Sequence, residues 1–279
     1  MVPMRSPTPV LTSTANPRVK AAVALRDRRE RDATGLTLVD GAREVRRALD
    51  AGVVVSDAFV CESLVGGPDA RAALDRLTAS DIAVTSVSEA VFAKLAFGSR
   101  TEGLVVVART PTTALPELAP GPEPLILVLE GVEKPGNVGA VLRTADGAGV
   151  DAVVAASAVT DLYNPNAIRA SAGTIFGVPL AAAPSADVLA WLRSFGCRIV
   201  TARVDATLPY TDVDLTGAVA IVLGAEADGL TDTWRGDDIT GVRIPMAGAA
   251  DSLNVSISAA ILAYEARRQR DRASRGTST

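Results

Sequence analysis

The sequence predicts an α/β protein of two domains, and three features of its pattern carry this prediction. Short apolar segments alternate with helical segments along most of the 279 residues, as they do where helices are layered on a sheet. Residues 125–129, LILVL, form an all-apolar run that is typical of a strand buried on both faces of a parallel sheet. Residues 109–122 are proline-rich and lack periodicity, which indicates a linker between two alternating regions.

This linker divides the chain into four predicted segments. Residues 1–14 are rich in Pro, Ser and Thr, and we expect a disordered tail. Residues 15–108 form the predicted N-terminal domain, and residues 109–122 form the linker. Residues 123–279 form the second domain, which begins with the buried strand.

Helix and strand signals follow one another in order through the N-terminal domain. The first predicted helix starts at Asn16, a good N-cap, has Pro17 in its first turn and ends at Gly35. Ser88 is the predicted cap of a short helix that ends at Leu95. The other predicted helices cover residues 42–52 and 69–78, and predicted strands cover residues 36–39, 53–61, 82–85 and 104–108.

The second domain continues the alternation and ends in two glycine-containing loops. An apolar run at residues 220–223 leads into the first loop, residues 224–230, and the second loop, residues 244–248, leads towards an apolar helix. Ser252 and Asn254 are cap-type residues at the start of that helix. The other predicted strands are residues 125–129, 152–155, 179–180 and 198–201, and the predicted helices are residues 138–147, 186–194 and 255–272 and one that ends at Ser171.

The composition excludes several classes of function. The chain contains no histidine, so His-dependent nucleophile pairs and His-based metal sites are excluded. Cys61 and Cys197 lack metal-ligand spacing, and we therefore expect no metal. No run of 18 or more apolar residues occurs, and the N-terminus lacks the pattern of a secretory signal, so we expect a cytoplasmic protein without a membrane partner.

Charge is distributed unevenly along the chain. The formal net charge of −4 disfavours nucleic acid binding by the chain as a whole. Basic residues nevertheless outnumber acidic ones within the first fifty residues and again near the C-terminus. These two clusters indicate either a phosphate-binding surface or ordinary solvated helix faces. The C-terminal cluster consists of Arg267, Arg268, Arg270, Arg272 and Arg275.

The usual nucleotide-binding fingerprints are absent from the sequence. No G-x-G-x-x-G follows the first strand of either domain, and no P-loop pattern occurs. An ordinary Rossmann dehydrogenase, a common Rossmann-type methyltransferase and a P-loop NTPase are therefore disfavoured. A cofactor, if bound, is expected on loops late in the chain.

Three segments resemble, in order, the motifs of one enzyme family. They are residues 129–145, LEGVEKPGNVGAVLRTA, residues 224–230, GAEADGL, and residues 244–256, IPMAGAADSLNVS. Together they resemble the SpoU (TrmH-type) RNA ribose 2′-O-methyltransferases of the SPOUT superfamily. The resemblance is close over residues 125–268 and looser before them.

This resemblance implies a fold, a cofactor and an assembly. The C-terminal domain is expected to be a parallel-sheet SPOUT domain with a deep trefoil knot, which nothing in the periodicity itself indicates. The N-terminal domain resembles the small ribosomal-protein-like α/β domain that many family members use for RNA recognition. The cofactor is expected to be S-adenosyl-L-methionine, and the protein is expected to be a homodimer packed through the knotted region.

The resemblance also assigns roles to individual residues. The cofactor-binding positions are expected to be Leu223, Gly224, Ile244, Met246 and Leu253. The positions that match the family's catalytic set are Asn137, Arg143, Glu226, Ser252 and Asn254. The expected RNA contacts are Arg169 and, on the first predicted helix, Arg26, Arg28 and Arg29.

Arg143 matches the residue that the family proposal makes the general base. Removing a proton from a guanidinium is costly, so we interpret Arg143 instead as a clamp that positions the ribose hydroxyl. Glu226 or solvent would then take the proton. We expect Asn137 in the loop before the helix and Arg143 on the helix face, six residues later.

The sequence therefore predicts an enzyme that uses S-adenosyl-L-methionine to methylate a ribose 2′-OH in structured RNA. Ribosomal RNA is favoured over transfer RNA because of the two-domain layout. Two other classes stay open, namely a family member that binds RNA without catalysis and a small-molecule α/β enzyme. The sequence specifies neither the target nucleotide nor whether the modification is housekeeping or confers antibiotic resistance.

Overall fold

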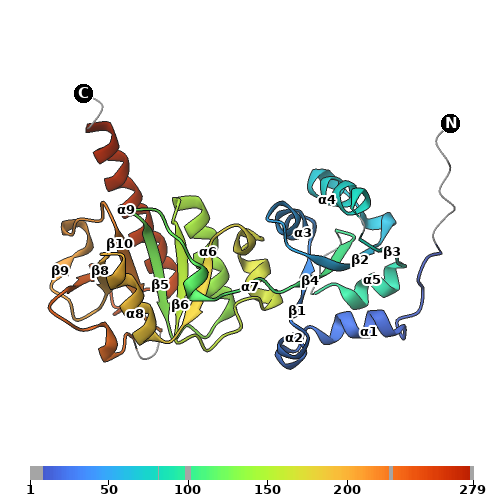
Figure 1. Cartoon of the computed structure of the whole chain (residues 1–279), viewed down its shortest axis with the longest axis horizontal. Coiled ribbons are helices and arrows are strands. Elements are labelled where there is room, and N and C mark those ends of the chain that lie inside the picture. Colours follow the sequence, from blue (N-terminus) through green and yellow to red (C-terminus); the bar gives the residue numbers. More distant parts are fainter. Residues whose placement is uncertain (1–8, 81, 98–101, 226–228, 277–279) are drawn as a thin grey trace. The chain divides into compact units, whose positions relative to one another are not determined.

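A computed structural model describes residues 9–80, 82–97, 102–225 and 229–276 and shows two compact units (Figure 1). The first unit comprises the chain up to Pro111 together with the segment Tyr163–Gly177. The second comprises Thr112–Leu162 and the chain from Val178 onwards. Residues 163–177, which the sequence places in the second domain, group with the first unit in the structure.

The first unit is a four-stranded mixed sheet between two layers of helices. The strands are β1 (Leu36–Asp40), β2 (Val55–Val60), β3 (Val84–Ser86) and β4 (Leu104–Arg109), in the order β1-β4-β2-β3. Strand β4 is antiparallel to β1 and β2, and β3 is parallel to β2. The helices are α1 (Pro17–Ala24), α2 (Arg28–Thr34), α3 (Ala42–Asp50), α4 (Gly67–Ala79), α5 (Glu89–Leu95) and α7 (Pro165–Ala170).

Helices α1 and α5 cover one face of this sheet, and α3 and α4 cover the other (Figure 1). The α1/α5 side contains a buried cluster that includes Leu25, Phe59 and Phe92. Alternate residues of the central strand β4, such as Val105 and Val107, point into this cluster. That alternation is what two-sided burial of a sheet requires.

The single helix predicted from Asn16 to Gly35 is wrong, because the structure contains two helices there. Asn16 caps α1 and Gly35 ends α2 in the left-handed conformation, as predicted. Between them, the Asp27 side chain accepts a hydrogen bond from the N–H of Arg29 and starts a new helix. A short acceptor side chain offers the backbone an alternative to continuing the first helix.

The predicted disordered tail, residues 1–14, is described only from residue 9. In that part, Leu11 pairs with Val87 beside the edge strand β3. The N–H of Leu11 donates to the carbonyl of Ser86 at 2.8 Å, and the N–H of Ser88 donates to Leu11 at 3.0 Å. Backbone pairing of this kind attaches the end of the tail to the first unit.

The second unit is a seven-stranded sheet in which every pair is parallel. The strands are β5 (Leu125–Glu130), β6 (Ala152–Ala156), β7 (Leu180–Ala183), β8 (Arg198–Ala202), β9 (Leu208–Pro209), β10 (Val219–Leu223) and β11 (Ile239–Arg243). Their spatial order is β7-β6-β5-β10-β8-β11-β9. All six residues of β5 are buried, which confirms the predicted two-sided burial of this strand.

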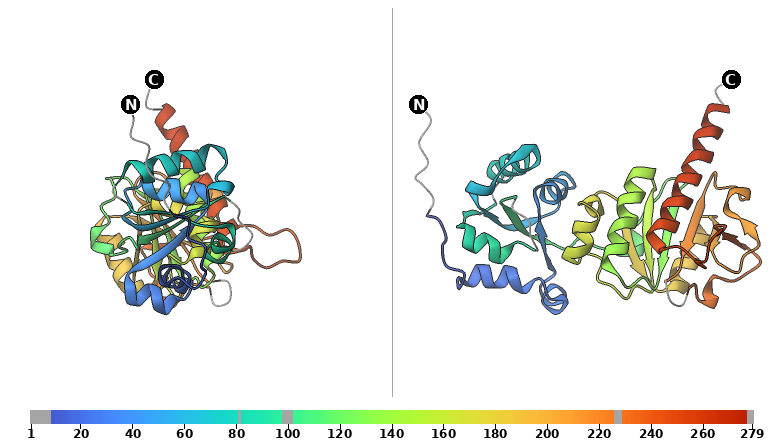
Figure 2. Two further views of the ribbon diagram at one scale, coloured as in Figure 1. Left: turned by 90° about the vertical axis from the view of Figure 1, so that its right-hand side faces the viewer. Right: turned by 180° about the vertical axis from the view of Figure 1, so that it is seen from behind.

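Three helices cover this parallel sheet. They are α6 (Pro135–Ala148), α8 (Ser185–Ser194) and α9 (Val255–Gly276). Figure 2 shows α6 and α9 side by side on one face, and α8 packs on the other. The α9 face that packs inwards contains Leu262 and Ala266, whereas Ile257 is 51% exposed.

The predicted linker contributes to the second unit's core. Leu115 and Leu118 are buried in the cluster that also contains Val188 and Trp234. Ala114 pairs with Ala182 beside β7. Residues 114–118 of the predicted linker are therefore anchored to the second unit.

Strand register brings the carboxyl ends of the second sheet to one edge. Leu129 pairs with Leu223 of β10 and with Ala155 of β6. The loops after β5, β6, β8, β10 and β11 therefore leave the sheet on the same side. Ligands of open parallel sheets bind beyond this edge. In the part of the chain described, no helix is long and apolar enough to cross a membrane.

Candidate functional site

A cavity of about 640 Å³ lies beyond the carboxyl ends of β8, β10 and β11. Residues 223–225 line it from the end of β10, residues 243–246 from the end of β11, and residues 251–253 from the approach to α9. These are the two glycine-containing loops and the helix start that stand out in the sequence. Their convergence at the ligand-binding edge of a parallel sheet makes this cavity the candidate active site.

The structure brings all five predicted cofactor-binding residues together. Each one lines the cavity: Leu223, Gly224, Ile244, Met246 and Leu253. Four of the five carry apolar side chains, and the fifth exposes its backbone. Such a lining suits a ligand with an aromatic ring and a polar edge, gripped by packing and by main-chain hydrogen bonds.

Gly224 is required by the close return of its own loop. A Cβ at this position would lie 2.3 Å from the backbone carbon of Gly229 and 2.6 Å from the nitrogen of Leu230. The N–H of Gly229 donates to the carbonyl of Ala225 at 3.1 Å, which closes the loop. Gly229 has a φ of +67°, a conformation that glycine adopts without strain.

Asn254 connects two of the predicted motifs. Its Nδ2 donates to Oδ1 of Asn137 at 3.3 Å. Its own Oδ1 accepts the N–H of Ser256 at 2.9 Å, so Asn254 also caps the first turn of α9, as predicted. One side chain therefore aligns the start of α9 with the start of α6.

Asn137 lies within α6 and not in the preceding loop, which corrects that expectation. The helix begins at Pro135 because proline suits the first turn, so Asn137 is in the first turn as well. Arg143, six residues later on the same helix, is exposed and has no partner among the described residues. Six residues correspond to about 240° of rotation, so the two side chains project from different sides of α6.

Of the remaining two predicted catalytic residues, the structure describes only Ser252. Ser252 lines the cavity next to Leu253. Glu226 lies outside the described residues, so its role stays a prediction.

The cavity also has charged lining residues that the sequence analysis did not predict. Arg203 holds Asp205 through two hydrogen bonds of 2.8 Å, and Arg235 and Arg243 line the same cavity. The hydrogen bonds from Arg203 lower the pKa of Asp205 to about 2. Arg203 and Arg243 lie at the carboxyl ends of β8 and β11, a position that could have identified them.

Two of the four predicted RNA contacts are engaged within the first unit. Arg26 donates to the carbonyls of Lys94 at 3.0 Å and Ala96 at 2.6 Å, at the end of α5. Arg169 donates to the carbonyl of Phe97, and both guanidinium groups lie 5.6 Å from the centre of the Phe97 ring. Because free carbonyls at a helix end require donors, these arginines serve the structure of this unit.

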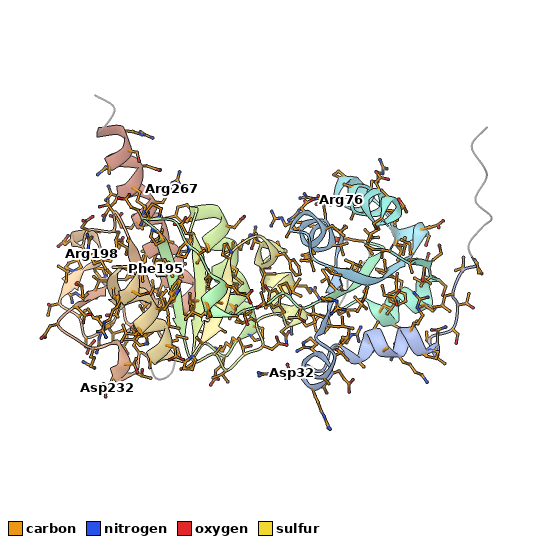
Figure 3. All side chains as sticks on the ribbon, viewed as in Figure 1. Asp32, Arg76, Phe195, Arg198, Asp232 and Arg267 are labelled. Atoms are coloured by element: carbon orange, nitrogen blue, oxygen red, sulfur yellow. The ribbon has the colours of Figure 1, made fainter. Side chains whose placement is uncertain are left out.

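The other two predicted contacts lie on α2. Arg28 pairs with Asp32, which is labelled in Figure 3, at 3.5 Å. Both side chains are more than half exposed. The side chain of Arg29 is exposed and has no partner in the described parts of the chain. Arg29 is therefore the predicted contact that is available to an external phosphate.

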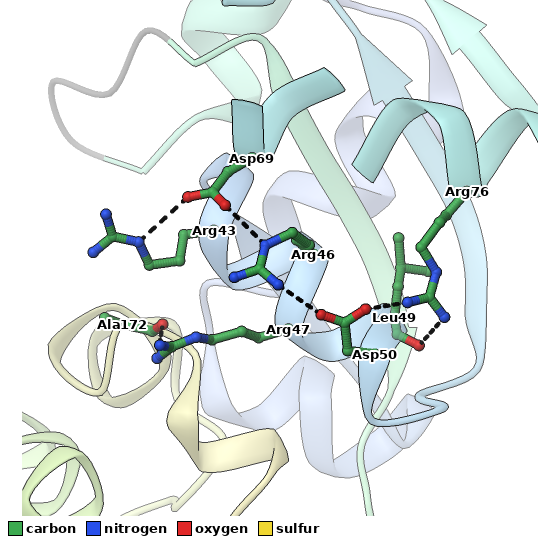
Figure 4. A network of polar contacts seen from close by, with 8 residues as sticks. All are labelled: Arg43, Arg46, Arg47, Leu49, Asp50, Asp69, Arg76 and Ala172. Carbon is green, nitrogen blue, oxygen red and sulfur yellow. Dashed lines mark hydrogen bonds and ion pairs between the residues drawn. The ribbon is translucent and has the colours of Figure 1, made fainter. Parts of the chain in front are cut away.

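A larger basic cluster occupies α3 and α4 (Figure 4). Arg46 bridges Asp69 and Asp50 at 2.8 Å each, and Arg76 also pairs with Asp50. Arg43 is 55% exposed at the side chain and makes only a 3.5 Å contact with Asp69. The spacing of Arg43, Arg46 and Arg47 could have identified this face from the sequence. 

The basic end of α9 is largely paired. Arg267, labelled in Figure 3, pairs with Asp271 at 2.9 Å, and Arg268 pairs with Glu265. Arg270 donates to the carbonyl of Glu123 at 2.9 Å, and burial lowers the pKa of this guanidinium. These contacts favour a structural role for this part of the C-terminal cluster.

The fold and the cavity define a two-unit α/β protein with a ligand site at the carboxyl edge of a parallel sheet. Residues 124–264 match the model of the SpoU rRNA Methylase family, and residues 16–106 match the MRM3-like substrate binding domain. The chain belongs to the SpoU rRNA Methylase family, which confirms the resemblance seen in the three motifs.

Full-length relatives and solved structures are similar over nearly the whole chain. The 23S rRNA (guanosine(2553)-2′-O)-methyltransferase RlmP of Bacillus subtilis is 26% identical over 92% of this chain and 98% of its own. A crystal structure described as an RNA 2′-O ribose methyltransferase is 44% identical, with a TM-score of 0.82 over 94% of this chain and 99% of that one. An AdoMet-bound rRNA methyltransferase from Sinorhizobium meliloti is 29% identical, with a TM-score of 0.84 over 94% and 98% of the two chains.

Proposed function

We propose that this protein transfers the methyl group of S-adenosylmethionine to a ribose 2′-OH in ribosomal RNA. The observation that carries the proposal is the single cavity formed by all five residues that match the family's cofactor loops. The chain's family and its relatives support the enzyme class and the cofactor, since the relatives include 2′-O-methyltransferases of 23S rRNA and a structure with AdoMet bound.

The residues of the cavity fit this cofactor. Leu223, Ile244 and Leu253 supply apolar contact for an adenine ring. The volume of the cavity, about 640 Å³, lies in the range of small-molecule sites. Gly224 lines the cavity, and its lack of a side chain lets the loop close against Gly229. When bound, the cofactor supplies an electrophilic methyl group next to a sulfonium.

The protein's own groups must position the attacking hydroxyl and accept its proton. We assign to Arg143 the binding of the RNA backbone beside the target ribose, because its guanidinium is exposed and not engaged elsewhere in the described residues. The hydrogen bond from Asn254 to Asn137 keeps α6 and α9 in register beside the cavity. Ser252 offers a hydroxyl at the cavity wall, and Glu226 or solvent accepts the proton.

Ribosomal RNA is the favoured substrate, and the first unit is assigned to its recognition. This unit matches a substrate binding domain, and its α2 and α3 present guanidinium groups such as Arg29 and Arg43. Guanidinium groups bind phosphate in a fork geometry that lysine does not reproduce. Transfer RNA is the alternative substrate, and the experiment below tests it separately.

The assembly, the knot and the location are further parts of this proposal. Ile257 and Tyr264, seven residues apart on α9, are 51% and 53% exposed, and we assign this stripe to a homodimer interface. The insertion of β10 between β5 and β8, with β11 beyond β8, is compatible with a trefoil knot. A cytoplasmic location follows from the proposed substrate.

The experiment that tests this function uses the full chain, labelled S-adenosylmethionine and two unmodified RNAs supplied separately. The proposal predicts label in ribosomal RNA with wild-type protein and labelling that is slower by on the order of a hundredfold with Arg143→Ala. Label in transfer RNA alone would keep the chemistry and overturn the substrate. No label in ribosomal RNA, whether naked or assembled into particles, with cofactor binding intact, would support the non-catalytic reading instead.

A further inference from the structure

Glu130 is a buried carboxylate that none of the predicted roles includes. It is the last residue of β5 and only 3% exposed. Its Oε2 accepts the N–H of Thr231 at 2.7 Å, and its Oε1 accepts the hydroxyls of Thr231 at 2.8 Å and Ser185 at 2.6 Å. A buried carboxylate costs several kcal/mol unless it is hydrogen-bonded in this way, so the three donors account for its burial.

Thr231 is the residue at which the loop after β10 ends. Four residues of that loop line the cavity: Gly224, Ala225, Gly229 and Leu230. The loop begins beside Leu223, which is paired with Leu129 in the sheet. Both ends of the loop are therefore held by the last two residues of β5, the first end by the backbone of Leu129 and the second by the carboxylate of Glu130.

The carboxylate also accepts a hydrogen bond from a residue outside the loop. Ser185, the first residue of α8, donates its hydroxyl to Glu130, and its N–H donates to Oγ of Ser157 at 3.1 Å. Ser157 follows β6 and has a φ of +46°, an uncommon conformation for a residue with a side chain. The network thus joins the carboxyl ends of β5 and β6 and the start of α8 to the exit of the loop.

We propose that Glu130 is a positioning residue that holds the end of this loop, residues 229–231, in its cofactor-binding position. Neither Glu130 nor Thr231 lines the cavity, so Glu130 acts on the cofactor through Thr231 and the loop. The proposal rests on the assignment of this cavity to S-adenosylmethionine. It predicts that weakening the carboxylate–Thr231 contact raises the Kd and the KM for the cofactor more than it lowers kcat.

The test compares two donors to the same carboxylate oxygen. Thr231→Val removes the hydroxyl at the end of the loop while preserving side-chain shape, and Thr231→Ser keeps both donors. Ser185→Ala removes the other hydroxyl that donates to the same oxygen. Binding of S-adenosylmethionine to each purified full chain is measured by titration calorimetry well below its melting temperature. We expect about a tenfold higher Kd for Thr231→Val, which is the usual worth of a hydrogen bond to a charged group.

The controls separate positioning from general stabilisation. Thr231→Ser is expected to bind the cofactor within about twofold of wild type, and Ser185→Ala is expected to lower the melting temperature while also binding within about twofold. An unchanged Kd in Thr231→Val, or an equal rise in Ser185→Ala, overturns the positioning role. Leu253→Asp charges the cavity wall itself. If that variant binds normally, the cavity is not the cofactor site and the proposed function loses its site, whatever Thr231→Val does.

Discussion

Replacing Gly224 by alanine tests the shape of the cofactor loop at its tightest point. An added Cβ would lie 2.3 Å from the backbone carbon of Gly229, whereas ordinary van der Waals contact begins at 3.4 Å. The loop must therefore open by roughly 3.4 − 2.3 = 1.1 Å. The carbon of Gly229 belongs to the backbone, so it cannot rotate away as a flexible side chain would. Overpacking of this kind costs about 1–3 kcal/mol, which corresponds to a factor of about 5–150 in an equilibrium constant.

The assay is titration calorimetry with S-adenosylmethionine, accompanied by thermal unfolding of each protein. Gly224→Ala is expected to raise the Kd by a factor of about 5–150. Gly248→Ala is the matched control, because it lies in the neighbouring loop and a Cβ there meets no atom within 4 Å. We expect it to bind like wild type. Equal, wild-type affinity in both variants would refute the claim that the closed loop is the binding conformation.

Three further predictions concern single side chains. Arg143→Ala and Arg143→Lys should each lower kcat by on the order of a hundredfold, because lysine lacks the fork-shaped guanidinium that binds the RNA backbone. Because Arg143 is exposed, the melting temperature should stay within about 2 °C of wild type. Full turnover in the lysine variant would contradict the role of Arg143 as a clamp. Asn254→Asp keeps the acceptor for the α9 cap but loses the donor to Asn137, so methyl transfer should fall while thermal stability is preserved. Asp205→Asn should destabilise the protein relative to wild type above pH 4, and the difference in melting temperature should shrink as the pH falls towards about 2. The reason is that the pKa of Asp205 is lowered in the folded state and its pairing with Arg203 is lost only when the carboxylate is protonated.

Much of the local structure could be predicted because its causes are local. Caps such as Asn16, Ser88 and Asn254 lie where the sequence predicts them, since a side-chain acceptor next to free N–H groups needs no distant partner. The all-apolar strand at residues 125–129 likewise reflects only its own burial. The family motifs then predicted which loops line the cavity, and the structure places all five predicted cofactor-binding residues there.

Features that depend on distant partners could not be predicted. The sequence predicts Arg26 and Arg169 as RNA contacts, yet each donates to a backbone carbonyl more than 65 positions away in the chain. The sequence analysis assigns no role to Glu130, whose partner Thr231 lies 101 positions further on. Strand order has the same character, because nothing in β10 itself indicates that it lies between β5 and β8.

The central claim is that a methyl group reaches a ribose 2′-OH, and the chemistry of the labelled product tests it most directly. Ribosomal RNA labelled by the wild-type protein is hydrolysed completely with alkali, which requires a free 2′-OH to cleave each bond. A methylated 2′-OH protects its neighbouring bond, so the account predicts label in an alkali-stable dinucleotide, formed more slowly by on the order of a hundredfold with Arg143→Ala. Label released in a mononucleotide would mean that a base is methylated, which would contradict the account.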